Sequence, residues 1–145
     1  MKKLATICAV LGTAALLSAC TSNKTSNDDL AGHRYVLSTA STNVLTVAAP
    51  PVIEFYPLVQ NDRLKVVGKM CNNFNGIATY RNGILHADNL VMTRAICSET
   101  VLNMLDVEIS KMFIQGIKVE KRGDQLVLRS GRTTLIYKQE DIKRY

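Results

Sequence analysis

The stretch SETVLNMLDVEISKMFIQG, residues 98–116, decides the fold class of this chain because it is the one segment with a clear helical period. Its apolar residues recur about every 3.6 positions, and a single stripe holds Leu102, Leu105, Ile109 and Met112, with Val101 and Phe113 beside it. Ser98 can cap the start of this helix, and Gly116 can end it in the left-handed conformation. Segments on both sides have a period of two instead.

Strands are therefore predicted before and after the helix. Their expected ranges are 33–38, 53–56, 64–70, 77–81, 117–121, 125–130 and 133–138, with a further short strand around 44–47. Asn82-Gly83 predicts a tight hairpin, since both residues accept positive φ, and Gly68 predicts a bulge or a close approach. Residues 71–76 are rich in turn formers. The pattern favours an α+β fold: a curled antiparallel sheet forming a partial barrel, with one long helix packed on it or plugging it.

The N-terminus has the order of a bacterial lipoprotein signal: two lysines, a short apolar run, and Leu17-Ser18-Ala19-Cys20. The apolar run is shorter than the roughly 20 residues that a transmembrane helix needs. We therefore expect residues 1–19 to be removed and Cys20 to carry the acyl chains, palmitate among them, that hold the protein on a membrane. Thr21 follows the lipidated position, where Asp would favour inner-membrane retention. The expected location is thus the outer membrane, facing the periplasm.

Residues 21–29 contain no apolar side chain, so the sequence predicts a flexible polar tether over 20–29 and a single domain over 30–145. Without residues 1–19 the chain keeps 16 basic and 12 acidic side chains. Nine of the basic ones lie in residues 111–145, which could face anionic headgroups or form an ordinary solvated face of the sheet. No nucleic-acid partner is expected in this compartment.

Two cysteines remain after Cys8 leaves with the signal and Cys20 takes the lipid. Cys71 and Cys97 are expected to form a structural disulfide, because lone thiol pairs in an oxidising compartment are usually joined.

Two half-motifs carry a resemblance to a known family: GKMCNNFNG at residues 68–76 and MTRAIC at residues 92–97. Together they resemble the META domain of the HslJ-like heat-shock lipoproteins, over roughly residues 30–138. The resemblance implies an antiparallel sheet with one helix, an envelope location, and a link to stress or antibiotic tolerance; no enzymatic activity comes with the family. We interpret the motif residues Gly68, Asn72, Gly76 and Thr93 as structural, while a polar cluster that binds a small ligand remains the alternative.

Other chemistries find less support. His33 and His86 could combine with the two cysteines as a thiol-catalytic pair or a zinc set, but the spacing matches no known motif, and a disulfide would consume both thiols. We therefore predict no catalytic residues, no metal and no cofactor.

Two functions stay open for the domain. The first is a non-enzymatic, lipid-anchored structural or interaction module that contacts the membrane through Cys20 and an unknown envelope protein. The second is a carrier of a lipid or small amphiphile in a cavity between sheet and helix, lined by the four methionines Met70, Met92, Met104 and Met112.

Overall fold

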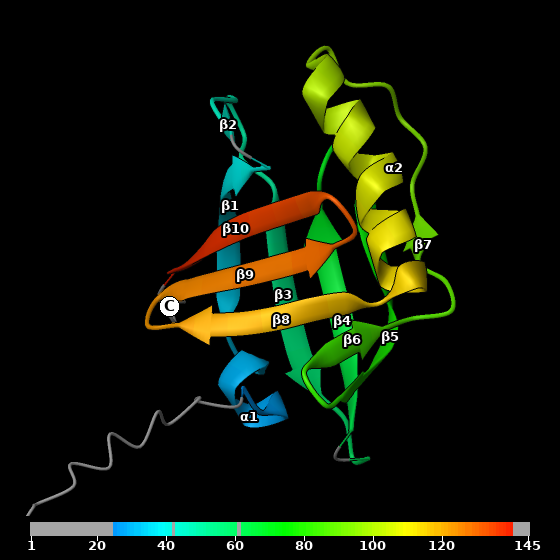
Figure 1. Cartoon of the computed structure of the whole chain (residues 1–145). Helices are drawn as coiled ribbons and strands as arrows, with labels where there is room; N and C mark the ends of the chain where they lie inside the picture. Colours follow the sequence, from blue (N-terminus) through cyan, green and yellow to red (C-terminus); the bar gives the residue numbers. More distant parts are fainter. Residues whose placement is uncertain (1–24, 42, 61, 141–145) are drawn as a thin grey trace, which may run out of the picture.

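The computed structural model describes residues 25–41, 43–60 and 62–140, so the expected signal, Cys20 and residues 21–24 of the expected tether lie outside the described residues. The elements appear in Figure 1. In chain order they are α1 (Asn27–Leu30), β1 (Arg34–Ala40), β2 (Asn43–Val44), β3 (Val52–Pro57), β4 (Arg63–Lys69), β5 (Asn73–Arg81), β6 (Ile84–His86), β7 (Val91–Met92), α2 (Thr100–Gln115), β8 (Ile117–Arg122), β9 (Gln125–Ser130) and β10 (Thr133–Glu140).

Eight of the strands form a closed antiparallel barrel. Their order around the wall is β1-β3-β4-β5-β6-β8-β9-β10, and β10 pairs back onto β1 from Arg34–Glu140 to Ala40–Leu135. The predicted partial barrel is therefore wrong, because the first and last strands of the wall complete the ring. Strands β2 and β7 lie outside the ring and pair with β1 and β5.

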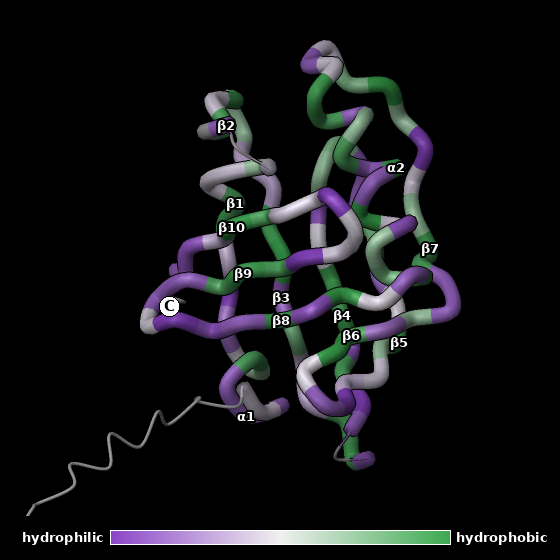
Figure 2. Tube along the Cα trace, viewed as in Figure 1, coloured by the Kyte–Doolittle hydropathy of each residue, from purple (hydrophilic) through white to green (hydrophobic). Residues whose placement is uncertain are grey.

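The barrel interior is filled by the inward-facing residues of this period-two pattern. In Figure 2 hydrophobic and hydrophilic residues alternate along the strands of the wall. The largest fully buried side chains from the strands include Tyr35, Phe55, Phe74 and Tyr137. Helix α2 packs on the part of the wall near β6, the shortest strand of the ring, and adds Ile109 and Phe113 to the same core.

The hairpin between β5 and β6 is confirmed: Asn82 has φ 51° and Gly83 has φ 79°, with Arg81 paired to Ile84. Strand β5 begins earlier than predicted, because Asn73 already pairs with Lys69 of β4. The turn-rich segment of residues 71–76 is thus mostly strand, and only Met70, Cys71 and Asn72 connect β4 to β5.

The start of α2 differs from the prediction. Its N-cap is Glu99, which makes no capping hydrogen bond through its side chain, so the predicted Ser98 cap is wrong. Asn103 bonds this segment instead, accepting from the Cys97 amide at 3.0 Å and donating to the Cys97 carbonyl at 2.8 Å. Gly116 ends the helix with φ 92° and ψ 132°, which is positive φ but outside the left-handed helical region.

The regular structure also starts before Leu30, within the predicted tether. Ser26 and Asp29 form a reciprocal capping box: the Ser26 amide donates to the Asp29 carboxylate at 2.6 Å, and the Asp29 amide donates to the Ser26 hydroxyl. The short helix α1 then inserts Leu30 into the core with no exposed surface. The bonds between Ser26 and Asp29, together with the burial of Leu30, thus hold residues 26–29 in place.

Candidate functional site

The two half-motifs meet at one junction between the barrel and the entry to α2. A disulfide joins Cys71, which follows β4, to Cys97, which precedes the helix; the Sγ atoms are 2.11 Å apart. The bond links two segments that are separated by 26 positions in the chain. Such a link restricts the unfolded chain more than the folded one and so favours the native state.

Asn72 lies at the centre of this junction, and its side chain uses its full hydrogen-bonding capacity. The side-chain oxygen accepts from the Thr93 hydroxyl at 2.9 Å and from the Ala95 amide at 2.7 Å. The side-chain nitrogen donates to the Ala95 carbonyl at 3.0 Å and to the Asp106 carboxylate at 2.7 Å. An amide side chain has two donors and two acceptor lone pairs, so all are occupied. The Asn72 side chain thus bonds both the amide and the carbonyl of Ala95, as the backbone of a neighbouring strand would.

Asp106 on α2 completes the junction from the helix side. Its Oδ1 accepts from the Cys71 amide at 3.1 Å and from the Asn72 amide at 3.0 Å, while its Oδ2 accepts from the Asn72 side chain. The residue is only 7% exposed. Asp106 was not among the residues predicted from the sequence, although a signal exists: an acid stands within the apolar stripe, four positions after Leu102 and three before Ile109.

The remaining motif residues bring backbones close together. A Cβ atom on Gly68 would lie 2.3 Å from Cζ of Phe74 and 2.7 Å from the Val52 carbonyl oxygen, and the ladder at Gly68 is regular, so the residue marks a close approach and not a bulge. A Cβ on Gly76 would lie 2.8 Å from the Leu90 side chain. Thr93 accepts from the Asn73 amide at 3.1 Å. All four motif residues therefore have structural contacts.

The histidines lie away from this junction. His33 contacts Gln139 through Nδ1 at 3.1 Å, and His86 is exposed on β6. Within the described ranges, no three His, Cys, Asp or Glu side chains are grouped as a metal site requires. Both described cysteines are bonded to each other, so neither is a free thiol.

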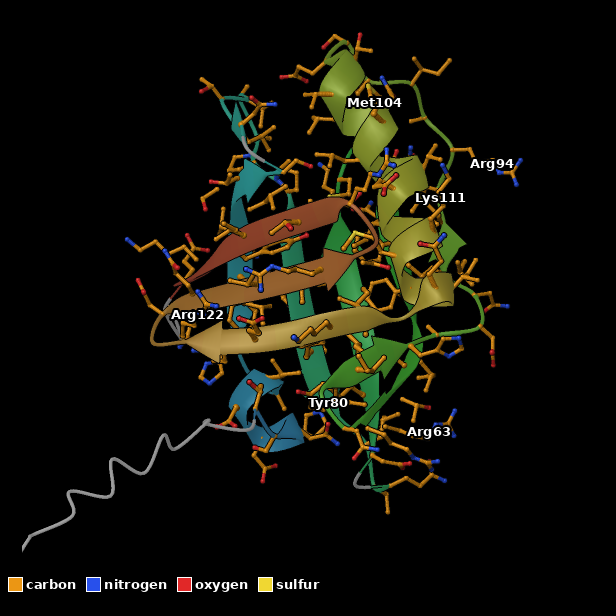
Figure 3. The ribbon with its side chains drawn as sticks, viewed as in Figure 1. Arg63, Tyr80, Arg94, Met104, Lys111 and Arg122 are labelled. Carbon is orange, nitrogen blue, oxygen red and sulfur yellow. A yellow bond between two sulfur atoms is a disulfide. The ribbon has the colours of Figure 1, made fainter. Side chains whose placement is uncertain are left out.

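A groove lies at the α1 end of the barrel. Two adjoining hollows of about 510 and 530 Å³ share Thr25, Tyr80 and the Asn82-Gly83 turn. The Tyr80 hydroxyl donates to the Thr25 carbonyl at 3.1 Å, and burial raises the pKa of Tyr80 above its usual value. Figure 3 shows Arg63 and Tyr80 at this end and Met104 at the other.

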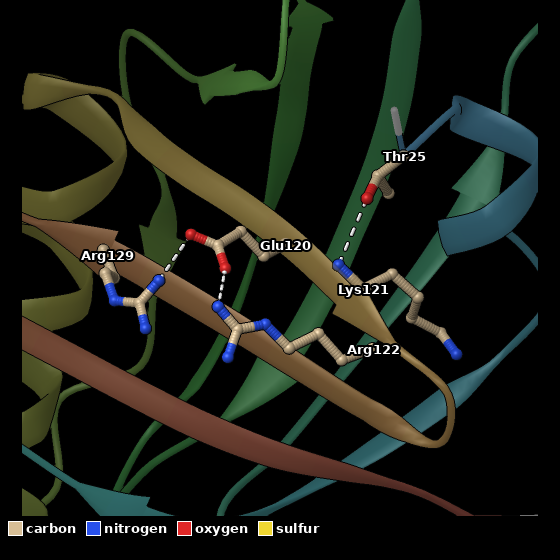
Figure 4. A network of polar contacts seen from close by, with 5 residues as sticks. All are labelled: Thr25, Glu120, Lys121, Arg122 and Arg129. Carbon is tan, nitrogen blue, oxygen red and sulfur yellow. Dashed lines mark hydrogen bonds and ion pairs between the residues drawn. The ribbon is translucent and has the colours of Figure 1, made fainter. Parts of the chain in front are cut away.

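The basic C-terminal third is partly neutralised near this groove. Figure 4 shows Glu120 between Arg122 and Arg129. Burial acts to raise the pKa of the Glu120 carboxyl, but the bond to Arg122 and the charge of Arg129 outweigh it and lower that pKa. The Lys138 Nζ atom also lies 3.8 Å from the Asp124 Oδ2 atom. These pairs support a solvated sheet face over a strongly cationic one.

The outer side of α2 is unexpectedly apolar. Met104, Val107 and Ile114 are each more than half exposed, and they lie on one side of the helix with Lys111. Val101, expected beside the buried stripe, is 39% exposed. Met104 therefore does not line an interior cavity.

A family model described as META domain matches residues 28–142, which include the junction, the barrel and the helix. The chain belongs to the META domain family. Over 146 aligned residues it is 35% identical to heat shock protein HslJ of Escherichia coli K12, and the match covers 98% of this chain and 99% of that protein.

Solved structures agree with the fold of this META domain. One NMR structure has 35% sequence identity and a TM-score of 0.72, covering 83% of this chain and 99% of its own. A second, of a protein from Burkholderia xenovorans, has 18% identity and a TM-score of 0.63; it covers 99% of this chain and 100% of its own and supports the fold alone. In the described part of this chain, neither helix has the length and hydropathy that a membrane span requires.

Proposed function

We propose that this META domain protein is an outer-membrane lipoprotein that faces the periplasm, anchored by lipid on Cys20, and that its domain is a non-enzymatic structural or interaction module in stress or antibiotic tolerance. The Leu17-Ser18-Ala19-Cys20 sequence supports the anchor. The relative named a heat shock protein supports the link to stress. A disulfide between Cys71 and Cys97 is compatible with an oxidising compartment.

The observation that carries the non-enzymatic role is the saturation of the junction. The motif residues and Asp106 are engaged with one another: Asn72 uses four hydrogen bonds, Asp106 accepts three, and the cysteines are joined. A catalytic or ligand-binding cluster needs at least one polar group directed at the substrate. Here the polar groups hold helix to barrel, so the domain would act through its surface.

The filled barrel disfavours the alternative of an amphiphile between sheet and helix. A void large enough for a ligand would leave the side chains around it accessible to a water-sized probe. Instead, Phe55, Ile109, Phe113 and Tyr137 have no exposed surface. Of the methionines expected to line such a cavity, Met70 and Met112 are buried in the core and Met92 is half-buried beside it.

A rescue experiment tests the proposal. A strain that lacks this protein is complemented with the wild type, with Cys20→Ala, or with Lys111→Ala as a control at an exposed site. We expect only the wild type and Lys111→Ala to incorporate labelled palmitate, to fractionate with the outer membrane, and to restore tolerance to heat or antibiotic. Full rescue by an unlipidated Cys20→Ala protein would contradict the need for an anchor.

The non-enzymatic part has its own test. Asn72→Ala removes the central side chain of the junction and should lower tolerance only as far as it lowers the amount of folded protein. A variant that is folded and abundant but inactive would indicate that Asn72 acts on a substrate or ligand.

A further inference from the structure

The point at which the chain enters the barrel is fixed. The Lys121 amide donates to the Thr25 hydroxyl at 3.1 Å, and the Tyr80 hydroxyl donates to the Thr25 carbonyl at the same distance (Figure 4 shows the first of these bonds). The capping box that starts at Ser26 follows at once. Thr25 is thus attached both to β8 and to β5, at the α1 end of the barrel.

This attachment limits where a lipid on Cys20 can lie. Five residue steps separate Cys20 from Thr25, and an extended chain of that length spans at most about 18 Å. Strand β4 alone, from Arg63 to Lys69, is about 20 Å long and leads from this end to Cys71 at the other. If Cys20 is lipidated, as proposed above, the α1 end of the barrel lies within about 18 Å of the bilayer, and the Cys71 end cannot be the one that faces it.

The surface at that end has the features of a membrane contact. Val59, in the loop between β3 and β4, is fully exposed, at 102% of the reference value, and the neighbouring Leu58 lines the groove. Arg63 lines the same groove, and its guanidinium bonds the Gln60 side chain at 3.2 Å. Among the ion pairs of the described residues, none involves Arg63.

We propose that this end of the barrel docks on the phospholipid headgroup layer of the bilayer that holds the Cys20 lipid. In this arrangement Val59 enters the interface between headgroups and acyl chains, and Arg63 bonds lipid phosphates, for which a guanidinium is well suited. The inference rests on the proposed lipidation. It adds a second contact that orients the domain.

The docking end of the barrel carries both acidic and basic side chains, so its attraction to the lipid headgroups should act mainly at short range. Acidic side chains lie there too: Asp28 lines the groove, Asp62 pairs with Arg81, and Asp29 is part of the capping box. Because acids and bases are mixed, the attraction to anionic lipid should depend only weakly on salt. In the docked orientation the start of α2, with Met104, points away from the bilayer.

The chain has no tryptophan, so one introduced Trp reports on its own surroundings. Val59→Trp places the reporter at the docking end. Ile96→Trp is the matched control, since Ile96 is 96% exposed and adjoins Cys97 at the opposite end. Each full-length lipidated variant is reconstituted into phosphatidylcholine and phosphatidylglycerol vesicles whose acyl chains are brominated close to the headgroup.

We expect bromine to quench the Val59→Trp emission at least about twofold more than that of Ile96→Trp, because an interfacial side chain lies about 5–10 Å into the boundary. Lengthening the tether by a Gly/Ser insertion should reduce this difference without abolishing it, and Arg63→Glu should reduce it further. Equal quenching at the two positions of a lipidated protein would overturn the docking inference alone. Loss of the difference with the longer tether would show that the surface has no affinity for lipid and would also overturn it. A mature chain without lipid on Cys20 would overturn the anchor, and this orientation with it.

Discussion

Removing the Asp106 carboxylate should destabilise the domain more than its single position on a helix suggests. Asp106→Ala leaves three buried donors without their acceptor: the Cys71 amide at 3.1 Å, the Asn72 amide at 3.0 Å and the Asn72 side chain at 2.7 Å. Hydrogen bonds to a charged group contribute about 1.5–3 kcal/mol each, but three bonds to one carboxylate are not additive. We take about 4 kcal/mol as their joint contribution. Alanine's higher helix propensity offsets about 0.6 kcal/mol of this contribution. The free energy of unfolding should therefore fall by between about 3 and 4 kcal/mol.

Urea unfolding followed by far-UV circular dichroism measures this loss, with the Cys71–Cys97 disulfide intact in every variant. At a slope of about 1.5 kcal/mol per molar urea, the midpoint should fall by roughly 2 M. Asp106→Asn should lie between wild type and Asp106→Ala, because its oxygen can still accept from the two backbone amides while its new NH₂ group faces the Asn72 side chain. Lys111→Ala, on the same helix but exposed, should change the free energy of unfolding by less than about 0.5 kcal/mol. A loss below about 1 kcal/mol for Asp106→Ala would show that the three bonds to this carboxylate contribute little to the stability of the domain.

Three further predictions concern other parts of the fold. Replacing Cys71 and Cys97 by alanine should lower the free energy of unfolding by about 3.5 kcal/mol for a 26-position separation, as measured in urea; no change after reduction of the wild type would contradict this. Gly68→Ala should lower the stability by about 2 kcal/mol, seen as a lower Tm, because the new methyl overlaps the Phe74 ring; Phe74→Leu in the same background should recover part of the loss. The bond from the Ser26 amide lowers the pKa of Asp29 below its ordinary value of 3.8. The capping box therefore stabilises α1 above pH 3.8, and this stabilisation is lost as the pH falls through the lowered pKa of Asp29. An NMR titration of Asp29 with a midpoint at or above 3.8 would disprove this effect.

Local parts of the fold could be predicted from the sequence because neighbouring residues encode them. The strand ranges follow from the period of two, and the Asn82-Gly83 turn follows from two residues that accept positive φ. The short helix α1 was missed although its signal is local: Ser26 and Asp29 have the spacing of a capping box. Here the polar composition of residues 21–29 hid a specific pattern.

Barrel closure had no such local signal. It depends on pairing between β1 and β10, whose partners Arg34 and Glu140 are about a hundred positions apart, and edge strands of an open sheet would have the same alternation. The candidate site divides in the same way. Cys71, Asn72 and Cys97 could be selected from sequence, and the apolar stripe marks Asp106 as unusual. The hydrogen-bond partners of Asp106 could not be predicted, because they precede it by 34 and 35 positions.

Helix α2, most of the strands, the α+β class and the family could thus be predicted from the sequence, since these depend on spacing along the chain. Long-range contacts show that the barrel closes, that Asp106 holds helix α2 to Cys71 and Asn72, and that the chain enters the barrel at Thr25, at the same end as Val59 and Arg63. These facts depend on contacts between residues that are distant in the chain. Such contacts form only when the whole core packs, so they cannot be predicted from the residue pattern of any single segment.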